Sequence, residues 1–287
     1  MQKDARICIA LFQQPGIYGR MHVVMQVTGR KKVCKLFAGI LILTMVCWSL
    51  ESYVHSSILD RLSQYENAYN PGGCRDLLLS KLIFKHRNDL GAILQKLGFT
   101  VGAELGVQQG FFAETTLKQW PGAKTYLLVD VWSEQDKYSD AANVNNAKQN
   151  NYYEQTKHRM SPFIANGVDV QICRNFTSIC AKQYPAHYFD YIYVDARHDF
   201  KSVYMDLVDW WPKLKPAGIF AGHDYVSQNE GPAQSGQDWT INFDGTIDTT
   251  GTVVKGAVNK FAAEQNVTVH VSQEAWPTWA IIKPVIH

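Results

Sequence analysis

The chain has 287 residues, of which 46% are hydrophobic and 12% aromatic, a composition that excludes low-complexity and wholly disordered proteins. Its formal net charge of +2 is divided unevenly between two parts. Residues 1–50 hold seven basic side chains and one acid, a net +6, whereas residues 51–287 hold 21 basic and 25 acidic side chains, a net −4. A nucleic-acid-binding protein would carry its basic surplus on the folded domain, so no nucleic-acid partner is expected.

The first predicted element is an apolar helix near the N-terminus. From Val33 to Leu50 the chain has eighteen residues interrupted by one charge, Lys35, and three consecutive basic residues precede them. At 1.5 Å per residue such a helix spans roughly 27 Å, enough for a thin bilayer. We predict a type II signal anchor over residues 33–50, with a basic cytosolic tail over 1–32 and the rest luminal in the endoplasmic reticulum or Golgi. A cleaved signal peptide, and hence secretion, is the alternative.

Residues 51–73 are polar and end in Pro-Gly-Gly, which breaks a helix, so they are predicted to form a stalk before one globular domain over 74–287. Helical and strand-like periods alternate along this domain. Helices are predicted over 76–97 and 111–120, along the stripe from Val203 to Leu214, and over 253–265. The polar stretch 133–151, rich in Asn and Gln, is predicted to be irregular and to be followed by a further helix that ends at about Met160. Strands are predicted over 100–106, 125–131, 168–173, 188–195 and 218–221, with a closing hairpin of 267–271 and 279–282. Strands that are apolar on both faces and alternate with helices indicate a doubly wound, mostly parallel α/β sheet.

The domain contains an odd number of cysteines, Cys74, Cys173 and Cys180, and no CxxC spacing. Neither a disulfide framework nor a zinc site is therefore predicted. Two Asn-x-Thr sequons, at Asn175 and Asn266, are compatible with a luminal domain.

The residues that follow the strands are the candidate site, because a ligand of a doubly wound sheet lies at the carboxyl ends of the strands. Gly106 and Gly110 allow a tight loop and a close approach to a ligand. Glu104 places a carboxylate there, which suits an ammonium or a sugar hydroxyl better than a pyrophosphate. Asp130 ends the next strand, where an acid suits the two hydroxyls of an adenosine ribose. The GxGxxG spacing of dinucleotide-binding folds is absent.

Three blocks of the sequence resemble a known family. VGAELGVQQG (101–110), YLLVDVW (126–132) and FDYIYVDARHDFKSVYMDLVDWWPKLKPAGIFAGHDY (189–225) are similar to class I S-adenosylmethionine (AdoMet)-dependent methyltransferases, and most of all to small-molecule and sugar O-methyltransferases. The resemblance covers about residues 90–284. It implies a Rossmann-like sheet of seven strands whose last strand is antiparallel, with AdoMet as cofactor.

The resemblance also implies roles for single residues. The loop from Glu104 to Gly110 would hold the methionine part of AdoMet, and Asp130 would bind the ribose. The adenine side would lie after the third strand, so we expect the sequon at Asn175 to remain unglycosylated. The full set that the resemblance assigns to cofactor binding is Glu104, Gly106, Gly110, Asp130, Val131, Trp132, Asn175 and Phe176, with Arg174 beside them.

Asp195, at the end of the fourth strand, would face the transferring methyl group. Some O-methyltransferases of this kind hold Mg²⁺ with that acid and another after the fifth strand, here Asp224. Two carboxylates in one pocket suit a hard cation, which would lower the pKa of the acceptor hydroxyl. The metal-free alternative uses His198 or His223 as general base. The residues alone do not choose between them.

The polar segment 228–251 follows the fifth strand and is predicted to be a lid over the acceptor site, with Trp239 and Phe243 as candidate contacts. The leading functional hypothesis is a membrane-anchored enzyme that uses AdoMet to methylate a hydroxyl of a small molecule or glycan. One alternative is a catalytically degenerate, membrane-anchored module that binds AdoMet. The other is a type II membrane glycosyltransferase, for which the Asp-x-Asp tripeptide of many metal-dependent members is missing. The sequence specifies neither the acceptor nor the oligomeric state.

Overall fold

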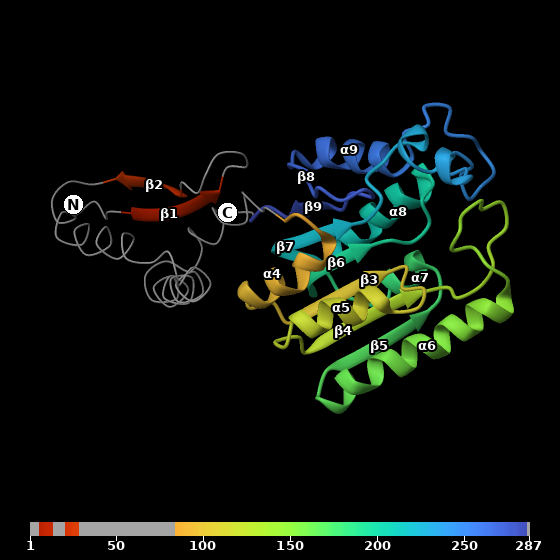
Figure 1. Cartoon of the computed structure of the whole chain (residues 1–287), viewed down its shortest axis with the longest axis horizontal. Helices are drawn as coiled ribbons and strands as arrows, with labels where there is room; N and C mark the ends of the chain where they lie inside the picture. Colours follow the sequence, from red (N-terminus) through yellow and green to blue (C-terminus); the bar gives the residue numbers. More distant parts are fainter. Residues whose placement is uncertain (1–5, 14–20, 29–83, 286–287) are drawn as a thin grey trace. The chain divides into compact units, whose positions relative to one another are not determined.

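The computed structural model describes residues 6–13, 21–28 and 84–285, in two separate units (Figure 1). The first unit contains an antiparallel hairpin of β1 (Arg6–Gln13) and β2 (Met21–Thr28). The predicted anchor over 33–50 and the predicted stalk over 51–73 lie outside the described residues. Within the described ranges, no helix combines the length and the apolar character that a membrane span requires.

The second unit is built on a sheet of seven strands in the order β5-β4-β3-β6-β7-β9-β8. The strands are β3 (Val101–Leu105), β4 (Thr125–Asp130), β5 (Asp169–Arg174), β6 (Phe189–Val194), β7 (Leu214–Gly222), β8 (His270–Val271) and β9 (Trp279–Ile282). The five strands β5, β4, β3, β6 and β7 are all parallel to one another. β9 is antiparallel to both of its neighbours, β7 and β8. The predicted sheet with an antiparallel last strand and a closing hairpin is thus confirmed. The strand order reverses at β3, where a doubly wound sheet opens its ligand crevice.

Six α-helices of the described domain cover the two faces of this sheet. They are α4 (Leu90–Lys96), α5 (Phe111–Gln119), α6 (Asn146–Ala165), α7 (Thr177–Ala181), α8 (Phe200–Trp210) and α9 (Val253–Gln265). α4, α5 and α6 lie on one face, and α7, α8 and α9 on the other (Figure 1). Short 3₁₀ turns supplement them: η1 (Arg87–Asp89), η2 (Trp211–Lys213), η3 (Gln228–Glu230) and η4 (Ala233–Ser235).

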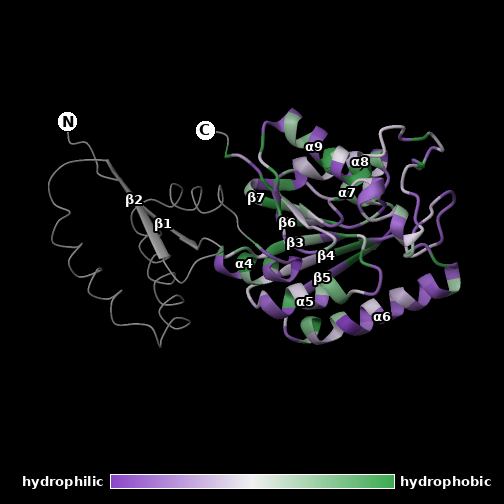
Figure 2. Cartoon of the chain, turned by 45° about the horizontal axis from the view of Figure 1, so that its top comes forward, coloured by the Kyte–Doolittle hydropathy of each residue, from purple (hydrophilic) through white to green (hydrophobic). Residues whose placement is uncertain are grey.

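The helix α8 shows how the sequence sets this packing. Asp199 caps its first turn by accepting a hydrogen bond from the Ser202 backbone N–H at 3.0 Å. Val203, Leu207 and Trp210 recur at helical spacing and are buried in the apolar core. Figure 2 shows the same division over the domain, with hydrophobic residues on the central strands and mainly hydrophilic residues along α6.

The structure differs from the sequence prediction at α6. This helix begins at Asn146, inside the stretch predicted to be irregular, because the Asn145 side chain accepts a hydrogen bond from the Lys148 backbone N–H and caps it. The helix has no apolar stripe from which its start could be predicted. Its buried residues are Gln149, Tyr152, Thr156 and Met160.

A disulfide joins Cys173, at the end of β5, to Cys180, in α7. The expectation that the cysteines form no disulfide framework was therefore wrong for this pair. The Cα atoms lie 6.1 Å apart, within the usual range for a bridge. The short loop that the bridge closes contains Asn175 and Phe176, so it braces one wall of the candidate site described next.

Candidate active site

A cavity of about 370 Å³ opens at the carboxyl ends of the central strands. Each of four adjacent strands contributes a residue at or just beyond its end: Gly106 after β3, Asp130 in β4, Asn175 after β5 and Asp195 after β6. This is the crevice that the strand order predicts for a ligand.

Gly106 lies in the loop after β3, called here the cofactor-side loop, and packs against the residues that follow β6. Its φ of 85° lies in the left-handed region, and a Cβ there would stand 1.9 Å from the carbonyl oxygen of Asp195. A side chain of any size is excluded, so glycine is required both for its conformation and for the space it leaves. The loop consequently lies directly against the strand that presents Asp195.

Asp130 lines the cavity and also holds the loop after β3. Its carboxylate accepts hydrogen bonds from three backbone N–H groups, those of Val107 at 2.9 Å, Gln108 at 2.8 Å and Trp132 at 2.7 Å. Burial raises the pKa of Asp130, and these N–H donors oppose that rise. A carboxylate offers about four lone pairs, so the three amides leave room for roughly one hydroxyl donor rather than the two that the sequence suggested.

Glu104 does not line the cavity. It is buried in the sheet, where the Tyr126 hydroxyl donates a hydrogen bond to its Oε2 at 3.0 Å. Burial raises the pKa of Glu104 well above its usual value, with Tyr126 opposing. Gly110 and Trp132 also lie outside the cavity wall. The residues of the predicted cofactor set that do line it are Gly106, Asp130, Val131, Asn175 and Phe176.

The four residues predicted for methyl transfer converge beyond β6 and β7. His198 Nε2 lies 3.4 Å from Asp195 Oδ1 and 3.2 Å from Asp224 Oδ2. His223 Nδ1 lies 2.8 Å from Asp224 Oδ1 and 3.9 Å from Asp195 Oδ2. Asp224 adopts a left-handed φ of 56°, a sparsely populated conformation for a non-glycine residue.

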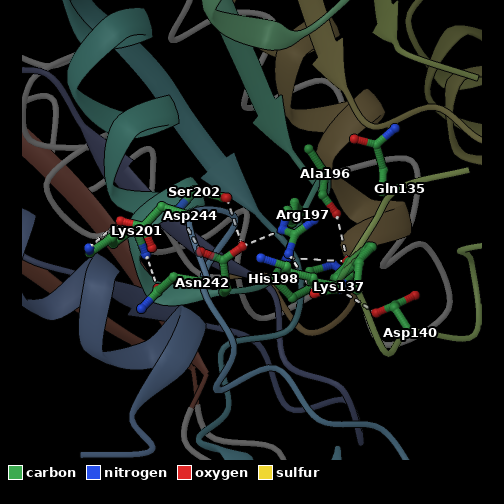
Figure 3. Close-up of polar contacts among 12 residues, drawn as sticks. Gln135, Lys137, Asp140, Ala196, Arg197, His198, Lys201, Ser202, Asn242 and Asp244 are labelled. Carbon is green, nitrogen blue, oxygen red and sulfur yellow. Dashed lines mark hydrogen bonds and ion pairs between the residues drawn. The ribbon is translucent and has the colours of Figure 1, made fainter. Parts of the chain in front are cut away.

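The loop between β4 and α6 supplies partners of His198 that the sequence did not reveal. Asp140 Oδ2 lies 2.9 Å from His198 Nδ1, and the Tyr138 hydroxyl lies 3.0 Å from the same nitrogen. Arg197 ties the loop down by donating to the Lys137 carbonyl at 2.9 Å (Figure 3). These residues sit in a polar stretch without periodicity, so no pattern set them apart.

Two further side chains enclose the cluster. The Trp239 ring, 2% exposed, packs on the imidazole of His198 with 4.3 Å between ring centroids. Arg87, in η1, places a guanidinium nitrogen 3.5 Å from Asp195 Oδ2. Trp239 was predicted as an acceptor contact, and the structure places it over a histidine; Arg87 was not predicted at all.

The electrostatics of the cluster follow from three acids around one imidazole. Burial lowers the pKa of His198, but hydrogen bonds to Asp140 and Asp195 and the charge of Asp224 outweigh it and raise the pKa well above its usual value. Burial raises the pKa of Asp195, yet the His198 hydrogen bond and the charges of His223, His198 and Arg87 leave it below its usual value.

The donor set fits a divalent cation. Asp195, His198 and Asp224 each offer one ligand atom, and these atoms all lie within 4.8 Å of one another. Two carboxylate oxygens and an imidazole nitrogen suit transition metals such as Mn²⁺ as well as Mg²⁺. A ligating histidine usually bonds a carboxylate through its other nitrogen, and Asp140 stands at that position.

Two loops meet beside the site. Asp238, in the segment predicted as a lid, donates its backbone N–H to the Ser139 carbonyl at 3.2 Å, and the Gln237 side chain accepts from the Ala141 N–H at 2.9 Å. Phe243, from the same segment, lines the cavity. The segment 228–251 therefore covers the site together with the loop after β4.

Residues 103–225, which contain the crevice and the cluster, match a family described as "Methyltransferase domain". Over these residues the chain is similar to methyltransferase domains. The match confirms the resemblance to methyltransferases that the sequence blocks predicted. None of the curated protein sequences matches this chain.

Among solved structures, the chain is similar to an O-methyltransferase from Bacillus cereus in complex with SAH, at 13% identity and a TM-score of 0.44 over 79% of this chain and 91% of that one. It is also similar to the N-methyltransferase NodS from Bradyrhizobium japonicum, at 14% identity and a TM-score of 0.44 over 69% of this chain and 95% of that one. At these values neither protein identifies an acceptor for this chain.

Proposed function

We propose that this chain is an enzyme that transfers the methyl group of AdoMet to a hydroxyl of a small molecule or glycan. The observation that carries the proposal is that the cavity and the cluster around His198 share a residue, Asp195. The cavity lined by Gly106 and Asp130 extends to Asp195, and Asp195 belongs to a cluster with two histidines and a second acid. A nucleoside site is thus joined to a set of groups that can accept a proton.

In the proposed reaction the acceptor hydroxyl loses its proton, its oxygen attacks the methyl carbon, and the carbon–sulfur bond breaks to release S-adenosylhomocysteine. His198 and His223 are the groups placed to take the proton, in the neutral forms that are populated above their raised pKa values. Asp140 fixes the ring of His198 through Nδ1, and Trp239 covers one face of that ring. The cover limits the access of water to His198, whose side chain is 11% exposed, and this strengthens the charge interactions of its ring.

We propose a divalent cation as a second cofactor, held by Asp195, His198 and Asp224. When bound, it would lower the pKa of the acceptor hydroxyl. In that arrangement Nε2 of His198 is a ligand, and His223 becomes the residue that receives the proton.

Labelled AdoMet, a panel of hydroxylated acceptors and the purified full-length protein test this proposal. We expect label transfer by the wild type and a loss of at least about 100-fold with Asp195→Asn, because this residue stands where charge develops. Asp209→Asn, which changes a half-buried acid of α8 outside the cluster, is the matched control and should remain active. A chelator tests the proposed cation. Methyl transfer that continues in the presence of the chelator would contradict a requirement for a divalent cation.

The outcomes separate the alternatives. AdoMet binding without label transfer to any acceptor would favour the degenerate binding module. No AdoMet binding by the folded protein would refute the proposed function altogether.

We further propose that the domain lies in an oxidising lumen, on the far side of the membrane from the basic tail. The Cys173–Cys180 disulfide supports this location, because such bonds persist in secretory compartments. Asn266 is exposed at the end of α9, whereas Asn175 lines the cavity. A mobility shift that glycosidase removes and Asn266→Gln abolishes is expected in cells. A shift lost only with Asn175→Gln would contradict the site assignment.

A further inference from the structure

One part of the cavity, called here its arm, is lined by residues of α7 and α8. Its wall is formed by the residues that follow β5 and by one side of α8. The side chains that concern us here are Phe176, Thr177, Met205, Asp206 and Phe243. None of the sequence-based assignments included Asp206, because on an amphipathic helix it reads as an ordinary polar residue.

Asp206 is a buried acid, 5% exposed, whose carboxylate reaches the cavity. The Thr177 hydroxyl donates a hydrogen bond to Oδ1. Among the described residues, no donor bonds Oδ2 and no basic side chain forms an ion pair with this acid. Buried carboxylates usually have their acceptor capacity filled, so a ligand that brings hydrogen-bond donors would complete this one.

The charges around Asp206 point the same way. Burial raises its pKa to about 7, the Thr177 hydrogen bond opposes the rise, and the nearby acids Asp209 and Asp199 add to it. None of the cationic side chains in the part of the chain that the structure describes stabilises the ionised form. A neutral donor group from a ligand would do so without bringing a second charge into the cavity.

The surroundings of Asp206 are apolar and partly uncovered. Phe176, Met205 and Phe243 line this arm and expose between 42% and 55% of their surface. Large apolar side chains that are exposed at a cavity wall suit a flat aromatic ligand, which would bury them on binding. A purine ring combines that flat surface with polar groups at its edge.

We propose that Asp206 recognises the adenine end of AdoMet by accepting a hydrogen bond from the exocyclic 6-amino group, while Phe176, Met205 and Phe243 cover the faces of the ring. This inference rests on the proposed function, since it assumes that the cavity holds AdoMet with its methyl group toward Asp195. It makes Asp206 the residue that selects adenine over a 6-oxopurine, whose carbonyl would face the carboxylate.

A purely structural role predicts something different. If Asp206 serves only to join α8 to Thr177 at the start of α7, its substitution would lower stability and weaken all ligands equally. A recognition role changes the preference between two ligands that differ at a single position. The ratio of two dissociation constants therefore distinguishes the two roles.

The experiment measures binding of S-adenosylhomocysteine and its 6-oxo analogue S-inosylhomocysteine to the full-length protein by isothermal titration calorimetry. We expect the wild type to prefer the 6-amino ligand by about 10- to 100-fold, as for a hydrogen bond to a charged group. Asp206→Asn should reduce or invert this preference, because a side-chain amide can donate to a 6-oxo group. Asp169→Asn, the same change at an exposed acid that begins β5, should leave it unaltered.

Each result has a separate meaning. A wild type that binds both ligands equally overturns the role of Asp206 with no variant required, as does an Asp206→Asn protein that keeps the wild-type preference. Failure of the wild type to bind either ligand would instead overturn the proposed function. Thermal unfolding of each variant verifies that the protein is folded.

Discussion

Replacing Gly106 with alanine tests whether the contact between the cofactor-side loop and β6 sets both stability and binding. The added Cβ would lie 1.9 Å from the Asp195 carbonyl oxygen and 2.6 Å from the Ala196 Cα, and φ is 85°. The loop must move away from β6 by about 1.5 Å to restore an ordinary contact distance of about 3.5 Å.

The expected loss has two parts. A left-handed conformation costs a residue with a Cβ roughly 1–2 kcal/mol. The movement also breaks two hydrogen bonds, from Gly106 N–H to the Val129 carbonyl at 2.8 Å and from Asp195 N–H to the Leu105 carbonyl at 2.7 Å. At about 1 kcal/mol each, these bring the fall in unfolding free energy to roughly 3–4 kcal/mol.

Gly98→Ala is the matched control. Gly98 also has a positive φ, 66°, but a Cβ there would meet nothing within 4 Å. Urea unfolding should therefore show a loss of about 1–2 kcal/mol for Gly98→Ala and about twice that for Gly106→Ala. Calorimetry should show weakened S-adenosylhomocysteine binding only for the second variant. Equal losses in the two proteins, with unchanged binding, would refute the claim that the contact with Asp195 matters.

Three further predictions follow from buried groups. Because burial raises the pKa of Glu104, the folded state retains a proton that the unfolded chain releases near pH 4.3, and wild-type stability falls as the pH rises. Glu104→Gln should therefore gain in Tm relative to the wild type between pH 5 and 8, with unaltered S-adenosylhomocysteine affinity; a widening deficit would contradict this. Burial raises the pKa of Asp206 in the free protein to about 7, and a bound 6-amino group would stabilise its ionised form. The affinity for S-adenosylhomocysteine, measured by calorimetry, should therefore rise from pH 6 to 8 in the wild type and rise less in Asp206→Asn. Cys180→Ser should lower the unfolding free energy by about 2.5 kcal/mol, the loop entropy of so short a closure, and should weaken cofactor binding; a stable variant with full affinity would show that the bridge braces nothing.

The fold could be read from the sequence because its signals are local. The strands that contain Tyr126–Asp130 and Tyr191–Val194 are apolar on both faces, and α8 has a clear apolar stripe. The acids at strand ends then located the site, since parallel strands bring their carboxyl ends to one edge. Asp130 and Asp195 were found in this way.

The remaining site residues depend on side-chain direction and long-range contact, which a linear pattern does not contain. Glu104 has the right position in the chain, but its strand turns it toward Tyr126 and away from the cavity. Asp140 lies in an irregular loop 58 residues before His198, its partner. Arg87 lies in a short 3₁₀ turn, within a stretch that the sequence suggested to be one continuous helix.

The junction between the two covering loops bears on how such an enzyme changes its acceptor during evolution. Ser139 and Asp238 meet through a carbonyl and an N–H of the main chain, groups that nearly every residue provides. Side chains on both loops, other than Tyr138, Asp140 and Trp239 that contact His198, can therefore be exchanged while the junction persists. Gly106 admits no such freedom, because a Cβ there would meet the Asp195 carbonyl oxygen. Descendants of this chain are thus expected to differ most in loops 133–145 and 228–251, and new acceptors can be acquired there without disturbing the strand ends of the proposed cofactor site.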